Sequence, residues 1–262
     1  MAPSGYDDFV AEFYDHVQPY AGRADLDFYV ERARGAHGPV LELGCGTGRV
    51  LVPMLEAGAE VCGIDSSRPM LSICVEKLAR LDEALRARAH LMLADMRDFT
   101  LGRHFALAVA PFRSFQHLLT VEDQLACLER VRVHLLRDGR LILDLFNPSL
   151  RALTDDARGE PFGHESPFTL GDGRVVRRSQ RVAGRDFAAQ VLNAELIYEV
   201  EHPGGGAERL VDAFSIRWLY RYEAEHLLAR AGFALEAVYE DYAGTPFSGR
   251  DGGELVLVAK IA

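Results

Sequence analysis

The sequence is poor in lysine and has no long apolar run. Of its 29 basic residues only Lys77 and Lys260 are lysines, and the formal net charge is −10. An acidic surface disfavours non-specific binding to nucleic acids and to anionic membranes. No apolar run approaches the ~20 residues of a membrane span, and the polar, acidic first residues are unlike a secretory leader. We therefore expect a cytoplasmic protein.

Cysteines are also few, and their positions indicate neither a disulfide framework nor a metal site. None of the four forms a CxxC pair, and none has a histidine at metal-ligand spacing. Cys62 and Cys74 have apolar neighbours, which is typical of buried free thiols. We expect no metal.

The most informative feature that the sequence contains is a glycine-rich stretch. The apolar segment 40–43 includes Glu42 and is followed by Gly44, Gly46 and Gly48. This pattern predicts a buried strand, a tight turn and a helix that starts at about Gly48. Glycines let a ligand approach the backbone, and N–H groups at a helix start can hold an anion.

Strands and helices alternate around this turn, which predicts an α/β fold with a parallel, doubly wound sheet. Two helices come first, one with apolar spacing from Tyr6 to Val17 and broken by Pro19, and one that ends near Gly35. Further helices are expected at 49–57, 68–85 and 121–136. Strands are expected at 40–43, 60–64, 90–94, 105–110 and 141–146.

The pattern changes after residue 146. Residues 148–162 have the composition of a loop, and three segments with alternating polarity follow at 174–183, 189–200 and 208–219. These segments predict an antiparallel sheet inserted into the α/β core. A helix at 222–231 and strands at 233–239 and 254–260 then complete the core.

Two ligands can be weighed for the glycine turn. A dinucleotide fingerprint has a glycine three positions after its second glycine, where this chain has Arg49, and Glu42 would repel a pyrophosphate. S-adenosylmethionine is net positive, so an acid beside the turn favours it. Asp65, after the second strand, can accept from the ribose hydroxyls. Asp95, after the third strand, can accept from the adenine amino group.

Residues 41–48 resemble the cofactor signature of class I S-adenosylmethionine-dependent methyltransferases. Residues 64–71 resemble the second-strand segment of the family, and residues 94–99 resemble its adenine segment. Residues 135–141 resemble the segment that leads into the fifth strand, although Arg137-Asp138 stands where Pro-Gly is usual. The resemblance spans about 6–146 and 220–262. It implies a Rossmann-like seven-stranded sheet with the last strand antiparallel.

The resemblance also implies a division of the chain. Residues 1–146 would form the cofactor-binding core with an N-terminal helical lid, and 220–262 would complete that core. Residues 147–219 stand where sugar-amine and glycine-type N-methyltransferases carry a β cap over the acceptor site. The inserted sheet is a candidate interface for a homodimer.

The expected S-adenosylmethionine site is made up of residues from the turn, from the ends of the second and third strands, and from the N-terminal lid. Tyr14, whose pair with Asp15 recurs in small-molecule members of the family, is placed at the methionine end, and Met70 is placed against adenine. Tyr6 is more typical of a core aromatic. The complete set is Tyr14, Glu42, Gly44, Cys45, Gly46, Thr47, Gly48, Asp65, Ser66, Met70, Asp95, Met96 and Pro111.

Methyl transfer from a sulfonium is an in-line displacement that depends on proximity, alignment and a dry pocket. A hydroxyl acceptor usually requires a general base, whereas an amine must be neutral. His117 is the best-placed candidate base, although a hydrogen-bonded structural histidine is the commoner role at such a position. The expected acceptor pocket comprises Arg113, Phe146, Arg217, Tyr220 and Tyr242.

Two hypotheses for function remain. The preferred one is an enzyme that methylates nitrogen or oxygen of a small molecule; the alternative is an inactive partner or sensor that binds S-adenosylmethionine. Nucleic-acid substrates are not expected, because Ala110-Pro111-Phe112 stand where methyltransferases of exocyclic base amines have Asn/Asp-Pro-Pro-aromatic.

Overall fold

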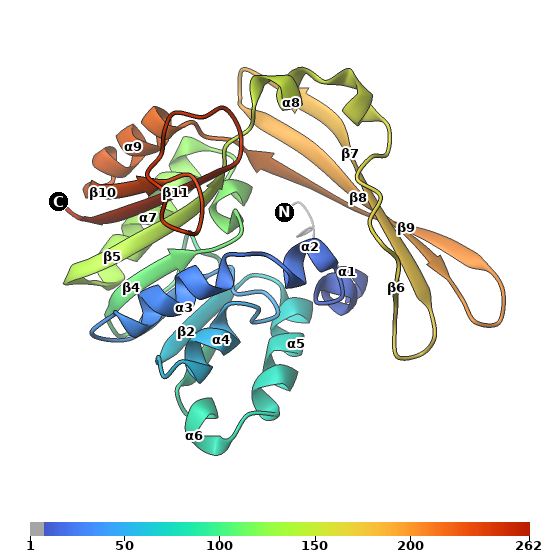
Figure 1. The fold of residues 1–262 in the computed structure, drawn as a ribbon. Coiled ribbons are helices and arrows are strands. Elements are labelled where there is room, and N and C mark those ends of the chain that lie inside the picture. The colour runs from blue at the N-terminus through green and yellow to red at the C-terminus, as the bar shows by residue number, and fades with distance from the viewer. Residues whose placement is uncertain (1–7) are drawn as a thin grey trace.

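The computed structural model describes residues 8–262, which form a seven-stranded mixed sheet flanked by helices and a separate four-stranded sheet (Figure 1). The large sheet has the order β10-β11-β5-β4-β1-β2-β3. Its first parallel strands are β1 (Val40–Leu43), β2 (Val61–Asp65), β3 (Ala89–Leu93), β4 (Phe105–Ala110) and β5 (Leu135–Phe146). β11 (Glu254–Ile261) runs antiparallel to β5 and β10 (Phe233–Tyr239). The predicted α/β fold with an antiparallel last strand is confirmed.

Helices cover both faces of the large sheet, and each face has its own apolar core. α3 (Leu26–Arg34), α4 (Leu51–Glu56) and α5 (Arg68–Ala79) pack on one face. α7 (Val121–His134) and α9 (Arg221–Arg230) pack on the other. Strand β1 contributes apolar side chains to both cores and is buried along its whole length, as expected of a central parallel strand.

The predicted insertion is an antiparallel sheet between β5 and α9. It has the order β6-β7-β8-β9 and comprises β6 (Phe168–Thr169), β7 (Val175–Asp186), β8 (Val191–Glu201) and β9 (Ala207–Arg217). One face, which we call the inner face, packs against Phe13 of α1 (Asp8–Tyr14); the ring of Phe13 lies 5.5 Å from that of Tyr198. In Figure 1 the N-terminal helices lie between the two sheets.

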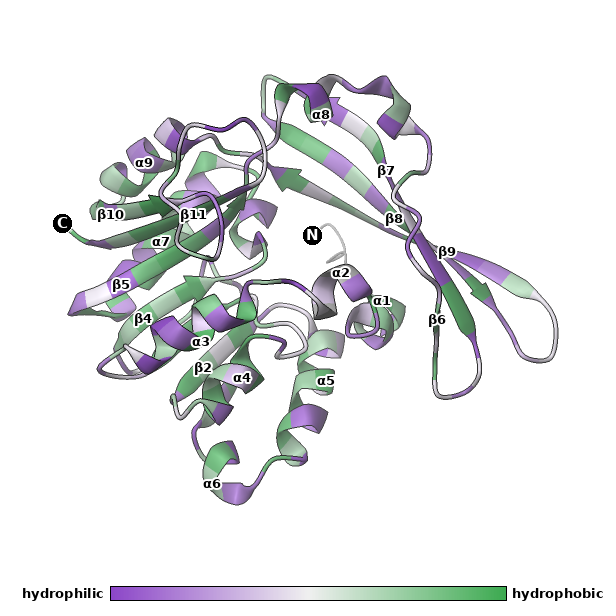
Figure 2. Cartoon of the chain, viewed as in Figure 1, coloured by the Kyte–Doolittle hydropathy of each residue, from purple (hydrophilic) through white to green (hydrophobic). Residues whose placement is uncertain are grey.

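The two sheets differ in their pattern of hydropathy. Figure 2 shows that the core strands are largely hydrophobic, whereas hydrophobic and hydrophilic residues alternate along β7 and β8. The face opposite the inner face carries ion pairs such as Arg177–Glu201 and Arg181–Glu195. A homodimer formed through that face would have to cover these charges. No helix within residues 8–262 has both the length and the apolar character needed to cross a lipid bilayer.

Several predicted boundaries shift, and local hydrogen bonds explain most of the shifts. The helix predicted at 68–85 is two helices, because the side chain of Asp82 accepts from the Leu85 amide and starts α6 (Glu83–Arg86). The predicted loop 148–162 contains α8 (Leu150–Thr154) and a short 3₁₀ helix (Asp156–Gly159), capped by Ser149 and Asp155. Strand β5 begins at Leu135, opposite Phe105, rather than at residue 141.

The N-terminal prediction was partly wrong. α1 ends at Tyr14, before Pro19, and Pro19 lies in the first turn of α2 (Gln18–Ala21). Proline is tolerated there because the first helical N–H groups have no intrahelical partner. Tyr6 lies outside the described residues.

A buried ion pair connects the N-terminal segment to the glycine turn. Asp25, immediately before α3, is fully buried and accepts from both terminal nitrogens of Arg49, at 2.7 and 2.6 Å. Arg23 lies 3.3 Å from the same carboxylate. Because Arg49 follows Gly48 in sequence, this bidentate pair fixes the position of the segment against the turn.

Replacing Asp25 with alanine should destabilise the protein strongly, since it leaves the Arg49 guanidinium buried without a counter-charge. We expect a loss of about 3–5 kcal/mol in the free energy of unfolding, measured by urea denaturation. Glu236→Ala is the matched control, because it breaks the exposed pair with Arg140 and should cost less than about 1 kcal/mol. Equal losses in the two variants would contradict the role given to Asp25.

Candidate functional site

The three glycines of the turn have positive φ angles, but they serve different purposes. A Cβ on Gly44 would lie 2.7 Å from the Ser114 Cβ, and one on Gly48 would lie 2.7 Å from the Cys74 Sγ. These two glycines are required by close packing. A Cβ on Gly46 would meet no atom within 4 Å, so this residue faces open space. The helix expected at Gly48 begins only at Leu51.

Asp65, at the end of β2, bridges the turn and the start of α5. Its Oδ2 accepts from the Gly46 amide at 2.8 Å, and its Oδ1 accepts from the Ser67 amide at 2.7 Å. Burial raises the pKa of Asp65, and the hydrogen bonds from the two amides oppose that rise. Each carboxylate oxygen keeps capacity for a further hydrogen bond, so Asp65 remains suited to a ligand diol.

Glu42 is almost fully buried, and its Oε2 has no hydrogen-bond partner among the described residues. Burial raises the pKa of this carboxyl well above its usual range; Arg49 opposes the rise, and Asp65 and Asp25 add to it. A buried carboxyl oxygen without a hydrogen-bond partner is costly unless a ligand provides one. The arrangement therefore favours a positively charged ligand beside the turn.

The residues expected near adenine lie in three different surroundings. Asp95 is engaged by Arg97, which donates to both carboxylate oxygens at 2.5–3.0 Å and keeps the pKa of Asp95 below its usual value. Met96 lies beside the turn, with its Cε 3.8 Å from the position of a Cβ on Gly44. Met70 is buried against Val10 of α1.

The remaining residues predicted to contact the cofactor lie in or near the turn. Cys45 and Thr47 are buried within it, Pro111 is buried at the end of β4, and Ser66 is exposed beside Asp65. The Ser114 hydroxyl, which the sequence did not single out for this role, donates to the Leu43 carbonyl at 3.0 Å and fixes the loop after β4 to β1.

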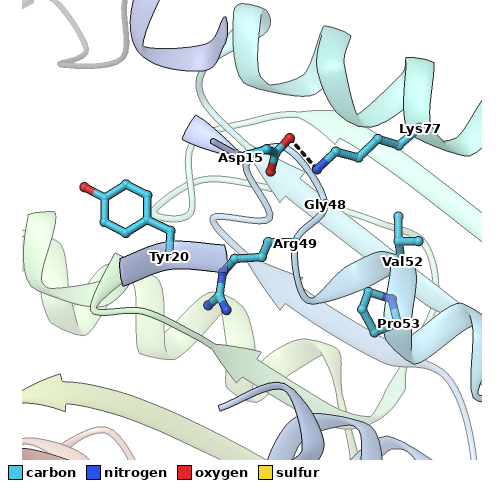
Figure 3. Close-up of a pocket in the computed structure, with 7 residues that line it drawn as sticks. All are labelled: Asp15, Tyr20, Gly48, Arg49, Val52, Pro53 and Lys77. Atoms are coloured by element: carbon cyan, nitrogen blue, oxygen red, sulfur yellow. Dashed lines mark ion pairs between the residues drawn. The ribbon is translucent and has the colours of Figure 1, made fainter. Parts of the chain in front are cut away.

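Residues of the N-terminal segment, the turn, α4 and α5 line a small cavity. The cavity has a volume of about 290 Å³ and is shown in Figure 3. Asp15 accepts from the Thr47 hydroxyl at 2.9 Å and pairs with Lys77 at 2.6 Å. The Tyr14 ring lies 4.7 Å from that of Tyr20, and burial raises the pKa of Tyr14. The cavity is lined by Asp15, Tyr20, Gly48, Arg49, Val52, Pro53 and Lys77.

His117 ends the 3₁₀ helix Ser114–His117 that follows β4. Its ring lies 5.6 Å from the Phe214 ring of β9, so it faces the inserted sheet. Burial lowers the pKa of His117 to about 4. The imidazole is therefore neutral near neutral pH.

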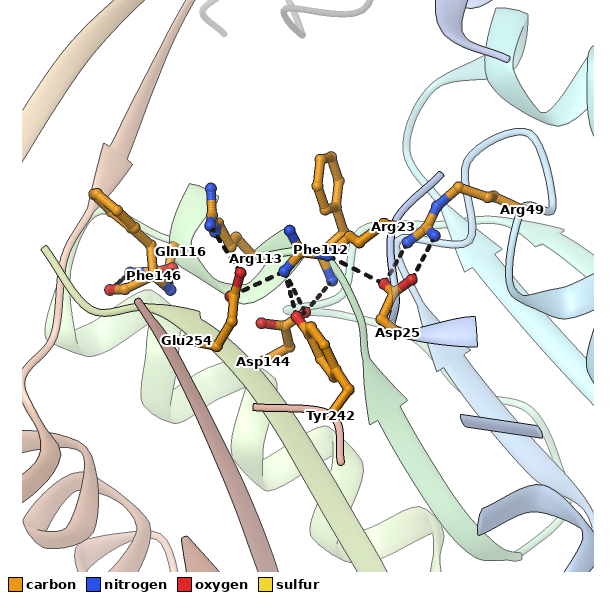
Figure 4. A network of polar contacts seen from close by, with 10 residues as sticks. All are labelled: Arg23, Asp25, Arg49, Phe112, Arg113, Gln116, Asp144, Phe146, Tyr242 and Glu254. Atoms are coloured by element: carbon orange, nitrogen blue, oxygen red, sulfur yellow. Dashed lines mark hydrogen bonds and ion pairs between the residues drawn. The ribbon is translucent and has the colours of Figure 1, made fainter. Parts of the chain in front are cut away.

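A buried polar network lies beneath the expected acceptor pocket (Figure 4). Asp144 accepts from the Phe112 amide at 2.9 Å and from the Tyr242 hydroxyl at 2.7 Å, and Arg23 contacts the same oxygen atom. Arg113 lies 4.8 Å from the Phe146 ring centre. In Figure 4 the Phe112, Arg113 and Phe146 side chains point to the same side of this network.

Arg217 and Tyr220 do not join this group. The Arg217 guanidinium is held by Gln124 at 3.0 Å, by Glu223 at 2.7 Å and by the Ala189 carbonyl. It therefore joins the end of β9 to α7 and α9. Tyr220 precedes α9, and its hydroxyl has no hydrogen-bond partner in the described part of the chain.

Comparison with known proteins agrees with this geometry. Residues 40–139 match the model of a methyltransferase domain. The chain is 32% identical, over 98% of both chains, to the cypemycin N-terminal methyltransferase of a Streptomyces species. It is 27% identical to a dTDP-3-amino-3,6-dideoxy-alpha-D-glucopyranose N,N-dimethyltransferase of Streptomyces fradiae, over 88% of this chain and 86% of that protein. The CcbJ methyltransferase of Streptomyces caelestis has a TM-score of 0.75 at 26% identity, with 99% and 98% coverage.

The chain is a class I S-adenosylmethionine-dependent methyltransferase.

The residues of this methyltransferase fit its cofactor. S-adenosylmethionine supplies an electrophilic methyl group when bound. Glu42 and Asp65 are the residues suited to hold it, because Glu42 offers a buried carboxyl oxygen without a hydrogen-bond partner in the described residues to a cation, and Asp65 offers carboxylate oxygens to a diol. The open space before Gly46 leaves room for the ligand next to the backbone.

Replacing Asp65 with alanine should weaken binding of S-adenosylhomocysteine about tenfold or more, because the diol loses an acceptor and the Gly46 amide loses its partner. Isothermal titration calorimetry measures this change. Asp95→Ala is the control on the neighbouring strand, and we expect a smaller effect because Arg97 already occupies that carboxylate. An unchanged affinity in the Asp65 variant would remove the ribose assignment.

Binding of the cofactor product should release a proton from Glu42. Burial raises the pKa of this carboxyl and so favours its protonated form in the free enzyme, whereas a bound ammonium favours its ionised form. Affinity should therefore rise with pH until Glu42 is ionised in the free enzyme. Calorimetry in buffers of different ionisation enthalpy measures the proton count, and Glu42→Gln should abolish the release. Proton uptake, or equal release in the variant, would contradict the assignment.

Proposed function

We propose that this methyltransferase transfers the methyl group to a neutral amino group of a small organic acceptor, by in-line displacement. The observation that carries the proposal is His117, which faces the inserted sheet and has a pKa lowered to about 4. The Streptomyces fradiae relative is named an N,N-dimethyltransferase and the cypemycin relative an N-terminal methyltransferase, and these names support the same class of acceptor.

The chemistry of His117 favours nitrogen over oxygen as the acceptor atom. A hydroxyl must lose its proton as it attacks, and an imidazole with so low a pKa is a poor general base near neutral pH. A neutral amine attacks through its own lone pair and can lose its proton to solvent afterwards. A neutral ring nitrogen of His117 can accept a hydrogen bond from the amine and orient that lone pair.

We also propose that the inserted segment 147–219 covers the acceptor, with 1–146 and 220–262 forming the cofactor-binding core. Phe214 of the inner face contacts His117, and Phe13 of the lid packs on the same face. An acceptor beside His117 would thus lie between the core and the inner face, where surrounding side chains exclude water.

The test is methyl transfer to paired amines and alcohols of the same carbon skeleton, with S-adenosylhomocysteine release and product mass as readouts. We expect N-methylated products only. The rate should rise with pH as the acceptor amine loses its proton, with no inflection from His117 between its pKa and that of the amine. His117→Phe should lower kcat about tenfold or more, and His117→Gln should recover part of it.

An O-methylated product as the main product would overturn the proposal. Intact cofactor binding without turnover of any amine would instead favour the inactive binding protein.

A further inference from the structure

Arginines surround an aromatic pair at the side of the expected acceptor site. The rings of Tyr20 and Phe112 lie 5.0 Å apart and join α2 to the loop after β4. Arg178, from the inner face of the inserted sheet, lies 4.8 Å over Tyr20 and donates to its hydroxyl at 2.6 Å. Arg23 and Arg49 lie over Phe112, at 4.8 and 5.4 Å. Arg113 directly follows Phe112.

Each of these guanidinium groups already has a carboxylate partner. Arg178 pairs with Glu165, and Arg49 with Asp25. Arg113 and Arg23 both pair with Glu254, at 3.4 and 2.9 Å, and Arg23 also contacts Asp144. The cationic side chains around the aromatic pair are therefore neutralised within the protein.

The inner face adds a further acid. Asp212 of β9 is paired in register with Leu196, whose side chain belongs to the apolar cluster around Phe13, and it is only 4% exposed. Residues paired across neighbouring strands share a face, so Asp212 lies on the inner face. Asp212 thus lies in the same region as the carboxylates Asp25, Asp144, Glu165 and Glu254, which pair with the arginines.

The pairing of these arginines with carboxylates affects which substrates can bind. A nucleoside diphosphate carries at least two negative charges and is usually bound by unpaired arginines or lysines. Here it would have to displace carboxylates from their arginine partners; Asp25 and Asp144 are fully buried, and Glu165 and Glu254 are partly buried, so the displaced charges would be poorly compensated. The Nε atoms of Arg113 and Arg178 are buried and have no hydrogen-bond partner in the described residues.

We propose that the acceptor is an amine that carries no phosphate group, and that Glu165 and Asp212 exclude nucleotide-linked amino sugars from the site. This inference rests on the proposed N-methyltransferase function and narrows its substrate class. Two relatives differ in this respect by name: one is a cypemycin N-terminal methyltransferase, and the other acts on a dTDP-linked amino sugar.

The first test is binding of dTDP and of inorganic pyrophosphate to the full-length enzyme saturated with S-adenosylhomocysteine, measured by calorimetry. We expect no binding in the micromolar range. Glu165→Gln should free the charge of Arg178 and strengthen dTDP binding at least tenfold. Asp212→Asn should act in the same direction and serves as the second variant if the first one fails to fold.

Glu195→Gln is the matched control. It frees Arg181 from a 2.7 Å pair on the same sheet, but on the opposite face, and should leave dTDP binding unchanged. Micromolar binding of dTDP to the unmodified enzyme would overturn the inference. A gain in the Glu195 variant equal to that in the Glu165 variant would overturn it as well.

The second test compares a dTDP-linked amino sugar, the same amino sugar as a methyl glycoside, and a dipeptide amide as acceptors. We expect methylation of phosphate-free amines only. Preference for the nucleotide sugar would overturn this inference and leave N-methylation intact. Failure of every amine would refute the proposed function, and the binding measurements would still decide whether the site rejects phosphate.

Discussion

The bidentate pair between Asp25 and Arg49 is the contact on which the site depends most. Arg49 follows the last glycine of the turn, and Asp25 lies just before the helix that covers one face of the sheet. The same arginine that rules out a dinucleotide fingerprint therefore fastens the N-terminal segment to the cofactor turn. Because Glu42 lies close enough to respond to Arg49, this pair also sets the electrostatic surroundings of the buried acid.

The pair between Asp25 and Arg49 is part of a larger network of buried ion pairs. Arg23 contacts Asp25, Asp144 and Glu254, and thus joins the N-terminal segment to the neighbouring strands β5 and β11. Asp144 in turn holds the Phe112 amide, and Phe112 has a φ of 51° that non-glycine residues seldom adopt. The cost of that conformation is offset by a charge-assisted hydrogen bond, and the result is a fixed aromatic surface beside Tyr20.

The sequence predicted the features that depend on short-range patterns of residues. Alternating strands and helices, the glycine turn and the inserted sheet follow from periodicity and turn residues, and Asp65 follows from its place at a strand end. Asp95 has the corresponding position after the third strand, but its carboxylate forms an ion pair with Arg97, two residues away. The contacts of Asp25, Arg23 and Arg178 join segments far apart in the chain, so no local pattern predicts them. The same holds for Arg217, whose partners lie on α7 and α9.

These constraints explain why the methyl donor could be inferred more readily than the acceptor. Donor recognition depends on backbone geometry, which glycines and strand ends reveal in sequence. In the proposal made here, acceptor recognition depends on which arginines lack a carboxylate partner after folding, and pairs such as Arg178–Glu165, between the inserted sheet and the segment before it, decide that. A basic residue in an acceptor site therefore indicates an anionic substrate only when the fold leaves it without a carboxylate.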